Sequence, residues 1–520
     1  MRKIIATLGL LGLAGCAVSG DDADGTDDAL SLGGVSATVQ ARLLVRHPSE
    51  QNHTWTITQG NALADILPMP VAAAWQRASI AAPKACSSSG NCEADFKLAT
   101  CASDADCGGG SCVALEATRK SDASDAKMVC AGHSDAILDE VHGLMTSAHQ
   151  RLDVTSLAPP TGRYLAAMRN AVTTLDKRGE RVVVRFLFAS YYNAKFDPQA
   201  VLADLTRDVG AGSKLTVSVA AHVGGAATWN HSKIIAVDGK EAIVGGMNLL
   251  EEHYLDADPV HDVSVHVKGP VVTTMQSFAN DLWDTACGSA NAVANLRGNA
   301  CPPAFVAAPV AAAGNVQMIG IGRLGTSRDA AMTAMVAMMD TARTSIHIGQ
   351  QDIGSLKLPG GTLVQDYVDA WIRAARRNVD IEIVLSNDDA HGGTGTADID
   401  SYSNGWSREE LWRGIDDRAA VIWPDAHPKL CKNLHIATLR NNGKTSWADG
   451  RPMANHGKVL IVDDFAYYVG SQNMYAANLA EYGVIVDSAA ETKRFASGYY
   501  AQVAATSTKT KTPYVDASCK

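Results

Sequence analysis

The sequence lacks an excess of positive charge. Its 520 residues include 45 Lys and Arg against 55 Asp and Glu, which gives a formal net charge of −10 at pH 7. Proteins that bind nucleic acids through the phosphate backbone are usually basic, because their cations neutralise phosphates. The composition therefore argues against a general nucleic-acid-binding protein, although a local basic cleft can occur in an acidic chain. We expect no nucleic acid partner.

Long apolar segments are also lacking. The apolar run at residues 4–13 is too short to span a bilayer, and no later run is long and apolar enough. Arg2 and Lys3 precede this run and Leu13-Ala14-Gly15-Cys16 ends it, which resembles a bacterial signal peptide with a lipobox. We expect a signal peptide over residues 1–16 and a lipid on Cys16, hence export and anchoring in the cell envelope, at the outer membrane or cell surface. The alternative is cleavage near Ala17 and free secretion. Residues 17–35 are acidic and predict a solvated tether.

The cysteines lack the Cys-x2-Cys spacing that is typical of zinc sites. Apart from the lipobox cysteine there are ten, an even number in a chain expected to be exported, so disulfides are the default. Six lie within residues 86–130, a Ser-, Gly- and Asp-rich stretch that predicts a disulfide-stapled surface insertion. Cys287 and Cys301 would close a local loop. Cys431 and Cys519 are left to pair with each other.

One pattern occurs twice in the chain. Each copy reads His-x-Lys-x4-Asp and continues, at the same offset, to two small residues, one further residue and an Asn. The copies comprise His231, Lys233, Asp238 and Asn248, and then His456, Lys458, Asp463 and Asn473. A single copy could be a histidine at a strand end beside a solvated lysine. Two copies with the same downstream residues are not plausibly a coincidence.

These residue types suit cleavage of a phosphodiester. The reaction needs a nucleophile, an acid for the leaving alkoxide, and positive charge at the phosphoryl oxygens. A neutral histidine can attack while a protonated one donates, and each lysine, two residues along an extended strand, points the same way as its histidine. The asparagines supply neutral donors. Neither motif contains the carboxylate cluster that hard cations require, so we expect no metal and no other cofactor.

The chain from residue 134 on alternates helical and β-rich segments, and the order recurs. In the first half we expect helices near 134–150 and 164–177, and strands near 152–157, 182–190, 215–221, 242–246 and 263–267. In the second half we expect helices near 329–341 and 363–377, and strands near 345–350, 381–386, 434–439, 466–470 and 484–487. The pattern predicts two tandem α/β lobes, residues 36–310 and 311–520, as a pseudo-twofold pair. The Gly-, Asp- and Ser-rich stretch 392–405 is either a lid or a passive surface loop.

At its motifs the sequence resembles the phospholipase D superfamily, and more narrowly the secreted streptomycete-type bacterial phospholipase D. The resemblance covers about residues 134–500 and includes Trp229-Asn-His-Ser-Lys-Ile-Ile-Ala-Val-Asp-Gly, Gly245-Gly-Met-Asn, Gln350-Gln-Asp-Ile, Tyr468-Val-Gly-Ser-Gln-Asn-Met-Tyr475 and Glu481-Tyr-Gly-Val-Ile-Val. It implies two α/β/α sandwich lobes with the active site between them. It also implies hydrolysis of phosphatidylcholine to phosphatidic acid and choline, with transphosphatidylation to added alcohols.

The resemblance also implies roles for individual residues. His231 would be the nucleophile that forms a phosphohistidine, and His456 the general acid. The phosphate would be held by Lys233, Lys458, Asn248 and Asn473. Two carboxylates, Asp262 and Glu481, would orient the histidines. The motif aspartates Asp238 and Asp463 would be structural. The substrate would be lined by Trp229, Gly246, Tyr254, Gln351, Tyr402 and Ser471; for the two tyrosines a plain packing role is the alternative to contact with a quaternary ammonium.

Three features depart from the streptomycete pattern. The insertion at 86–130 is larger than expected, and Leu250 stands where the family has a Trp, which bears on lipid preference. The family's cysteine beyond Gln-Gln-Asp is absent, which leaves Cys431 without its usual partner.

Two other functions remain open on the sequence alone. One is an exported phosphodiesterase or nuclease of the same superfamily, because the motif pair also suits the phosphodiesters of DNA. The other is an adhesive lipoprotein, suggested only by the cysteine-rich insertion. We expect instead a phospholipase D that acts as a monomer on a phospholipid bilayer or micelle surface, because the resemblance extends through both halves.

Overall fold

The computed structural model describes most of the chain. The described residues are 30–70, 102–107, 111–114, 128–131, 136–190, 195–222, 228–255, 259–289, 292–297, 301–354, 363–387, 390, 402–403, 405–441, 443–447, 450, 452–507 and 519. The expected signal peptide with Cys16, most of the cysteine-rich insertion and most of the 392–405 stretch lie outside these residues. In the described part, every helix is too short or too polar to cross a bilayer.

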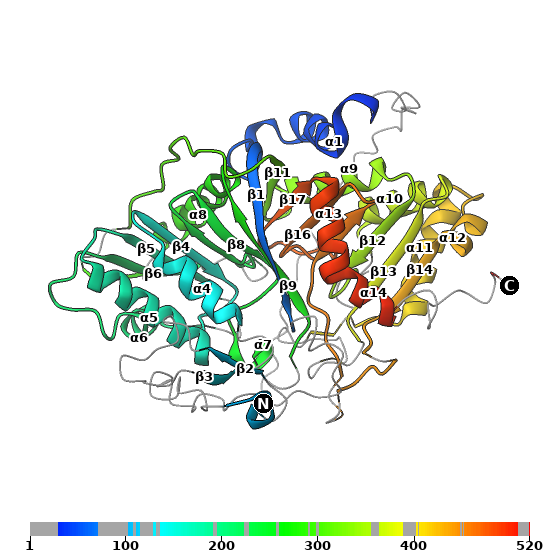
Figure 1. Ribbon diagram of the computed structural model, residues 1–520. Helices are drawn as coiled ribbons and strands as arrows, with labels where there is room; N and C mark the ends of the chain where they lie inside the picture. Colours follow the sequence, from blue (N-terminus) through cyan, green and yellow to red (C-terminus); the bar gives the residue numbers. More distant parts are fainter. Residues whose placement is uncertain are drawn as a thin grey trace, which may run out of the picture.

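Fifteen strands form one sheet that runs through both halves of the chain (Figure 1). The first half contributes β1 (Trp55–Met69), β4 (Arg151–Ser156), β5 (Val183–Ala189), β6 (Thr216–His222), β7 (Ile234–Val237), β8 (Glu241–Gly245), β9 (Asp262–Lys268) and β10 (Val293–Asn295). The second half contributes β11 (Val316–Leu324), β12 (Ser345–Gly349), β13 (Asp380–Leu385), β14 (Leu434–Thr438), β15 (Val459–Val462), β16 (Ala466–Gly470) and β17 (Ala480–Asp487). A separate small sheet pairs β2 (Ser111–Ala114) with β3 (Met128–Ala131).

The strand order is pseudo-twofold, as predicted. The order β6-β5-β4-β7-β8-β9-β1 is repeated in reverse as β11-β17-β16-β15-β12-β13-β14, and β1 pairs with β11 at the centre. Strand directions match as well: each half has three parallel strands in its outer part, with antiparallel strands leading inward from them. The first half adds β10, antiparallel to β6, at its edge. The lobes are therefore equivalent in topology and continuous through one ladder.

Helices cover both faces of the sheet, which makes each lobe an α/β/α sandwich. They are α1 (Leu30–Arg46), α4 (Ala136–Thr146), α5 (Gly162–Arg178), α6 (Pro198–Leu205), α7 (Glu251–Tyr254), α8 (Val271–Cys287), α9 (Ala330–Thr341), α10 (Gln365–Arg376), α11 (Arg408–Ile422), α12 (His427–Asn433), α13 (Ala489–Phe495) and α14 (Ala501–Ser507). Each lobe has its own apolar core under its outer helices, and a third core under α8 and α13 draws side chains from both lobes. This shared core holds the lobes together.

The N-terminal boundary of the fold differs from the prediction. Residues 30–35, expected in the acidic tether, begin helix α1, which crosses the top of Figure 1 above β1 and α9. Val35, Val39 and Leu43 are buried four residues apart, which is helical spacing on one face. The tether was predicted from acidic residues, and the last of these is Asp28. The apolar residues at helical spacing begin after it.

Both disulfides predicted outside the insertion are present. Cys287 is bonded to Cys301 at the end of α8, and Cys431 of α12 is bonded to Cys519. Within the insertion, Cys112 is disulfide-bonded and faces Cys130 across the β2–β3 ladder. The remaining insertion pairings lie outside the described residues.

The side chains of the two motif aspartates accept hydrogen bonds from the backbone at the start of β4 in the first lobe and of β12 in the second. Asp238 accepts hydrogen bonds from three consecutive N–H groups, residues 149–151, at 2.7–2.9 Å. Asp463 accepts from the N–H groups of residues 343–345 at 2.8–3.3 Å. Both have left-handed backbone, with φ of 52° and 49°. Their carboxylates therefore anchor the entry to β4 and β12.

This geometry predicts a stability defect for Asp463→Ala. Three N–H groups lose their acceptor, and alanine is strained at positive φ, so we expect the free energy of unfolding to fall by about 2–3 kcal/mol. Urea unfolding monitored by circular dichroism measures this change. The matched control is Asp464→Ala, because the side chain of Asp464 is exposed. Equal stability of the two variants would contradict the anchoring role.

Candidate active site between the lobes

The two motif histidines lie where the lobes meet. The ring centroids of His231 and His456 are 6.2 Å apart, and the rings are nearly perpendicular, at 79°. Both side chains are buried. The His-x-Lys triplets, expected on the strands, directly precede them, because β7 begins at Ile234 and β15 at Val459.

Backbone hydrogen bonds hold each histidine to the opposite lobe. The His231 N–H donates to the carbonyl oxygen of Ala480, and the His456 N–H donates to that of His261, both at 2.7 Å. Each accepting residue precedes a predicted orienting carboxylate. The exchange of bonds therefore puts each histidine beside the carboxylate of the other lobe.

An asparagine precedes the histidine in both motifs and shapes the chain there. The Asn230 Oδ1 accepts from the Ser232 N–H, and the Asn455 Oδ1 accepts from the Gly457 N–H, both at 3.1 Å. The side-chain N–H groups donate to carbonyl oxygens in the parallel strands or just after them, at Ser156 in one lobe and at residues 350 and 384 in the other. No role is predicted for these asparagines from the sequence, although their presence before the histidine in both motifs was the available signal.

Each histidine pairs with a carboxylate across the lobe interface. His231 Nδ1 lies 2.8 Å from Glu481 Oε1, and His456 Nδ1 lies 2.7 Å from Asp262 Oδ2. A carboxylate acceptor keeps the proton on Nδ1 and leaves Nε2 to react. These are the contacts that the resemblance implied for Asp262 and Glu481.

The motif lysines are buried beside the histidines. Lys233 Nζ donates to the His231 carbonyl oxygen at 2.6 Å, and Lys458 Nζ donates to that of His456 at 2.5 Å. Burial lowers the pKa of both lysines, to about 7 for Lys458, and for Lys233 the charge of Lys458 lowers the pKa further. Such a cluster of buried cations favours an anion that would offset the positive charge.

The histidines share this electropositive environment. Burial, followed by the charge of Lys233, lowers the pKa of His231 to about 4. Burial and both lysines hold the pKa of His456 well below its usual range. At neutral pH and without an anion, the environment thus favours neutral imidazoles, which suits a nucleophile.

The two motif asparagines follow β8 and β16 and are fully buried. In the described structure, the Oδ1 atoms of Asn248 and Asn473 have no hydrogen-bond partner. The Asn473 side-chain N–H donates to the Tyr475 hydroxyl at 3.0 Å. A phosphate oxygen would accept from the side-chain N–H groups of these asparagines, because the Oδ1 atoms have no proton to donate.

Two of the predicted substrate-lining residues, Gly246 after β8 and Ser471 after β16, serve packing. A Cβ at Gly246 would lie 2.1 Å from Asp262 Oδ1, so only glycine lets that carboxylate approach. The Ser471 hydroxyl accepts from the Tyr482 N–H at 3.0 Å and so ties β16 to β17. Here the structure uses both positions to build the sheet around the carboxylates.

The two predicted tyrosines lie against His456. The Tyr254 hydroxyl is 3.0 Å from both Asp262 Oδ2 and His456 Nδ1, which makes it part of that pair. The Tyr402 ring meets His456 edge-on with centroids 4.9 Å apart, and its hydroxyl lies 2.8 Å from His253 Nδ1. Tyr402 therefore packs edge-on against the His456 ring.

The last two predicted residues are at the margin of the site. Trp229 supplies its carbonyl oxygen to the Ala480 N–H at 3.0 Å, next to the bond that holds His231. Gln351 reaches the Ser403 carbonyl oxygen at 3.5 Å, beside Tyr402.

One buried residue of the site was missed from the sequence. Arg323 of β11 contacts Glu481 Oε2 and lies 3.4 Å from Asp329 Oδ2. The available signal was a single Arg within the apolar run 316–324, which is not among the predicted strands.

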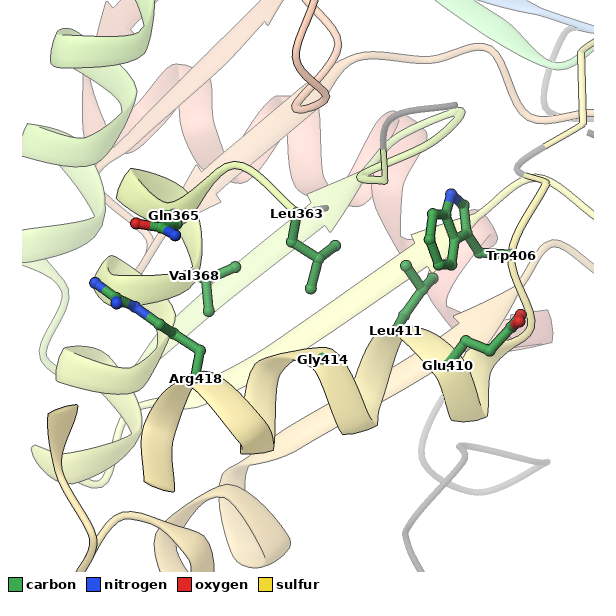
Figure 2. A pocket seen from close by; sticks show the side chains of 8 residues that line it. All are labelled: Leu363, Gln365, Val368, Trp406, Glu410, Leu411, Gly414 and Arg418. Carbon is green, nitrogen blue, oxygen red and sulfur yellow. The ribbon is translucent and has the colours of Figure 1, made fainter. Parts of the chain in front are cut away.

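A separate pocket of about 190 Å³ lies in the second lobe between α10 and α11 (Figure 2). Its lining comprises Leu363, Gln365, Val368, Trp406, Glu410, Leu411, Gly414 and Arg418. None of these is a predicted site residue. Trp406 follows Tyr402 by four positions, so a short stretch of chain joins this pocket to the aromatic residue at His456.

Among the residues described, one group has donors close enough together to hold a metal ion: His427, Cys431 and Cys519. Both sulfurs are joined in the disulfide, and His427 Nδ1 is paired with Asp416 at 2.8 Å. The group lies at α12, away from the histidine pair.

Comparisons with known proteins agree with this site. Residues 335–499 match the family described as "Cardiolipin synthase, PLD-like domain". The chain is similar to "Phospholipase D" of Streptomyces antibioticus, with 29% identity over 412 residues that cover 68% of this chain and 74% of that protein. Among solved structures it is similar to phosphatidylserine synthase of Haemophilus influenzae Rd KW20, with a TM-score of 0.51 and 11% identity over 72% of this chain and 85% of that one. At that identity, the likeness shows a shared fold alone.

The geometry of the site agrees with these likenesses. Two His-x-Lys-x4-Asp motifs converge, each histidine is paired with a carboxylate of the other lobe, and two lysines lie beside them. Residues 335–499 thus match a PLD-like domain and the chain is similar to a phospholipase D, which together support a phosphodiester-cleaving enzyme.

Proposed function

We propose that this enzyme is a phospholipase D that hydrolyses phosphatidylcholine-type phospholipids to phosphatidic acid and a free head group. One observation carries the proposal: the ring centroids of two buried histidines are 6.2 Å apart, and two buried lysines lie beside them. That arrangement suits a single phosphodiester anion. The likeness to a phospholipase D over 74% of that protein's length supports the lipid substrate.

The reaction begins at His231. Its Nε2 attacks phosphorus while His456 gives a proton to the departing head-group oxygen, so the P–O bond to the head group breaks as a P–N bond forms. The phosphatidyl group is then on His231. His456, now neutral, takes a proton from water as the water oxygen attacks phosphorus, and the P–N bond to His231 breaks to release phosphatidic acid. A primary alcohol in place of water yields a phosphatidyl alcohol.

The lysines and asparagines act on the phosphoryl oxygens. Negative charge increases there in each transition state, and the Nζ groups of Lys233 and Lys458 are already fixed by the carbonyl oxygens of the histidines. Preorganised charge of this kind lowers the barrier without further rearrangement. The Tyr402 ring, edge-on to His456, is the aromatic group that a quaternary ammonium head group would contact.

Leaving-group chemistry separates the two histidines. We expect His231→Ala to abolish choline release from phosphatidylcholine, because no nucleophile remains. His456→Ala should lower it by about 10²–10⁴-fold, and much less for a phosphatidyl nitrophenol, whose leaving group needs no proton. Choline and nitrophenol release measured side by side give both values. A phosphatidyl adduct on His456 in the parent enzyme would reverse the assignment.

A plasmid-nicking assay on the same preparations tests the alternative, an exported phosphodiesterase or nuclease. We expect choline release from phosphatidylcholine micelles and intact plasmid. Nicking that disappears in His231→Ala, without choline release from the parent, would replace phospholipid by nucleic acid as the substrate.

The pH dependence follows from the pKa values in the free enzyme. Burial lowers the pKa of Lys458 to about 7 and raises that of Asp262 to about 7. Lys458 thus loses its charge, and the His456–Asp262 pair loses a proton, as pH rises through 7. We expect kcat/KM to fall above about pH 7. Bound substrate anion favours the protonated lysine, so the fall in kcat should occur at higher pH. Coincident or flat profiles from pH 6 to 9 would contradict this assignment.

We further propose that the enzyme is exported and anchored by a lipid on Cys16, and that it acts as a monomer on a bilayer or micelle surface. The motif Leu13-Ala14-Gly15-Cys16 supports this proposal. Cys16→Ser should abolish labelling by a fatty-acid analogue and release the protein from the detergent phase. Cys112→Ser, at a disulfide-bonded cysteine, is the control for loss of a cysteine outside the lipobox. Unchanged labelling of the Cys16 variant would refute the anchor.

A further inference from the structure

The pseudo-twofold symmetry fails at a buried pair of positions beside the histidine-orienting carboxylates. In the second lobe, β11 places Arg323 directly opposite Glu481 of β17. In the first lobe, β1 places Met69 opposite Asp262 of β9. Since β1 and β11 are equivalent strands, a cation in one lobe corresponds to a thioether in the other.

The contacts at the two carboxylates differ accordingly. The two oxygens of Glu481 are divided: Oε1 faces His231 Nδ1 at 2.8 Å, and Oε2 contacts the Arg323 guanidinium. Arg323 is buried, and its other neighbour, Asp329, is itself engaged as the N-cap of α9. The Glu481 carboxylate thus has a permanent cation in direct contact.

Among the residues that the structure describes, Asp262 has no cation in direct contact. Its Oδ2 lies 2.7 Å from His456 Nδ1 and 3.0 Å from the Tyr254 hydroxyl, and its Oδ1 accepts from the Val263 N–H at 2.8 Å. Met69, buried beside it, supplies no charge. The nearby lysines do not distinguish the two pairs, because each lobe contributes one.

We propose that Arg323 makes the two histidines unequal: it keeps the proton off the His231–Glu481 pair and directs it to His456–Asp262. A proton added to His456–Asp262 neutralises a buried carboxylate. A proton added to His231–Glu481 must compete with a guanidinium already in contact with that carboxylate. Arg323 is therefore a positioning residue that selects His231 as nucleophile and His456 as acid. The inference rests on the proposed covalent route.

The pKa directions agree with this geometry. Burial raises the pKa of Asp262 to about 7, so this pair can hold a proton at neutral pH. Glu481 is equally buried, yet the Arg323 charge, followed by the bond to His231, holds its pKa below the usual value. The two carboxylates differ in opposite directions from their ordinary values.

The test is the location of the covalent adduct. Arg323→Met copies the residue of the first lobe, Arg323→Gln keeps polarity without charge, and Arg323→Lys keeps the charge. The control is Arg328→Met in the turn after β11, where Arg328 pairs with Glu50 at 2.8 Å. Each protein is mixed with a phosphatidyl nitrophenol and quenched in alkali, and the modified histidine is identified by peptide mapping.

We expect the parent, Arg323→Lys and Arg328→Met to carry the adduct on His231 alone. Arg323→Met and Arg323→Gln should carry it on both His231 and His456, with choline release reduced by about tenfold. If either neutral variant folds and still labels only His231, Arg323 does not select the nucleophile. If the parent shows no adduct on either histidine, the covalent route itself is wrong, and this role for Arg323 falls with it.

Discussion

The site depends on hydrogen bonds that each motif histidine makes with the opposite lobe. His231 is held by the backbone of Ala480 and by Glu481, and His456 by the backbone of His261 and by Asp262. Neither lobe alone contains an oriented histidine, because the carboxylate for each comes from the other. The continuous ladder through β1 and β11, and the core shared under α8 and α13, maintain this exchange. The contacts that hold the two lobes together are consequently the contacts that orient the two histidines.

The second constraint is the burial of like charges. Removing an ammonium group from water is costly, and the motif places two of them beside two imidazoles. The carbonyl oxygens of the histidines offset part of that cost for Lys233 and Lys458, and the lowered pKa values show that part remains. An anionic substrate supplies the missing charge. The site is thus strained electrostatically when empty and relaxed when a phosphodiester fills it, which is how preorganised charge stabilises a transition state.

Local patterns in the sequence predicted much of the fold, and long-range register explains what they did not predict. The repeated motif and the helical and strand periodicity placed the repeated elements within a few residues, and cysteine parity predicted Cys287–Cys301 and Cys431–Cys519. Strands β1 and β11 were missed. β1 pairs with β11 through its first part and with β9 through the rest, and shifts register in both ladders, so no single alternation marks it. The contrast between Arg323 and Met69 could not be found without that pairing.

A duplicated chain can treat its two histidines differently, whereas a symmetric dimer with one motif per copy must surround both with the same residues. This chain uses that freedom next to the reactive groups. Glu481 stands where the other lobe has Asp262, Ser471 where it has Gly246, and Arg323 where it has Met69. The backbone frame of the histidines remains equivalent, since both are held by matched bonds to the opposite lobe. The differences lie in the groups that hold the carboxylates, where a change of charge alters which histidine takes a proton and leaves the position of both rings unaffected.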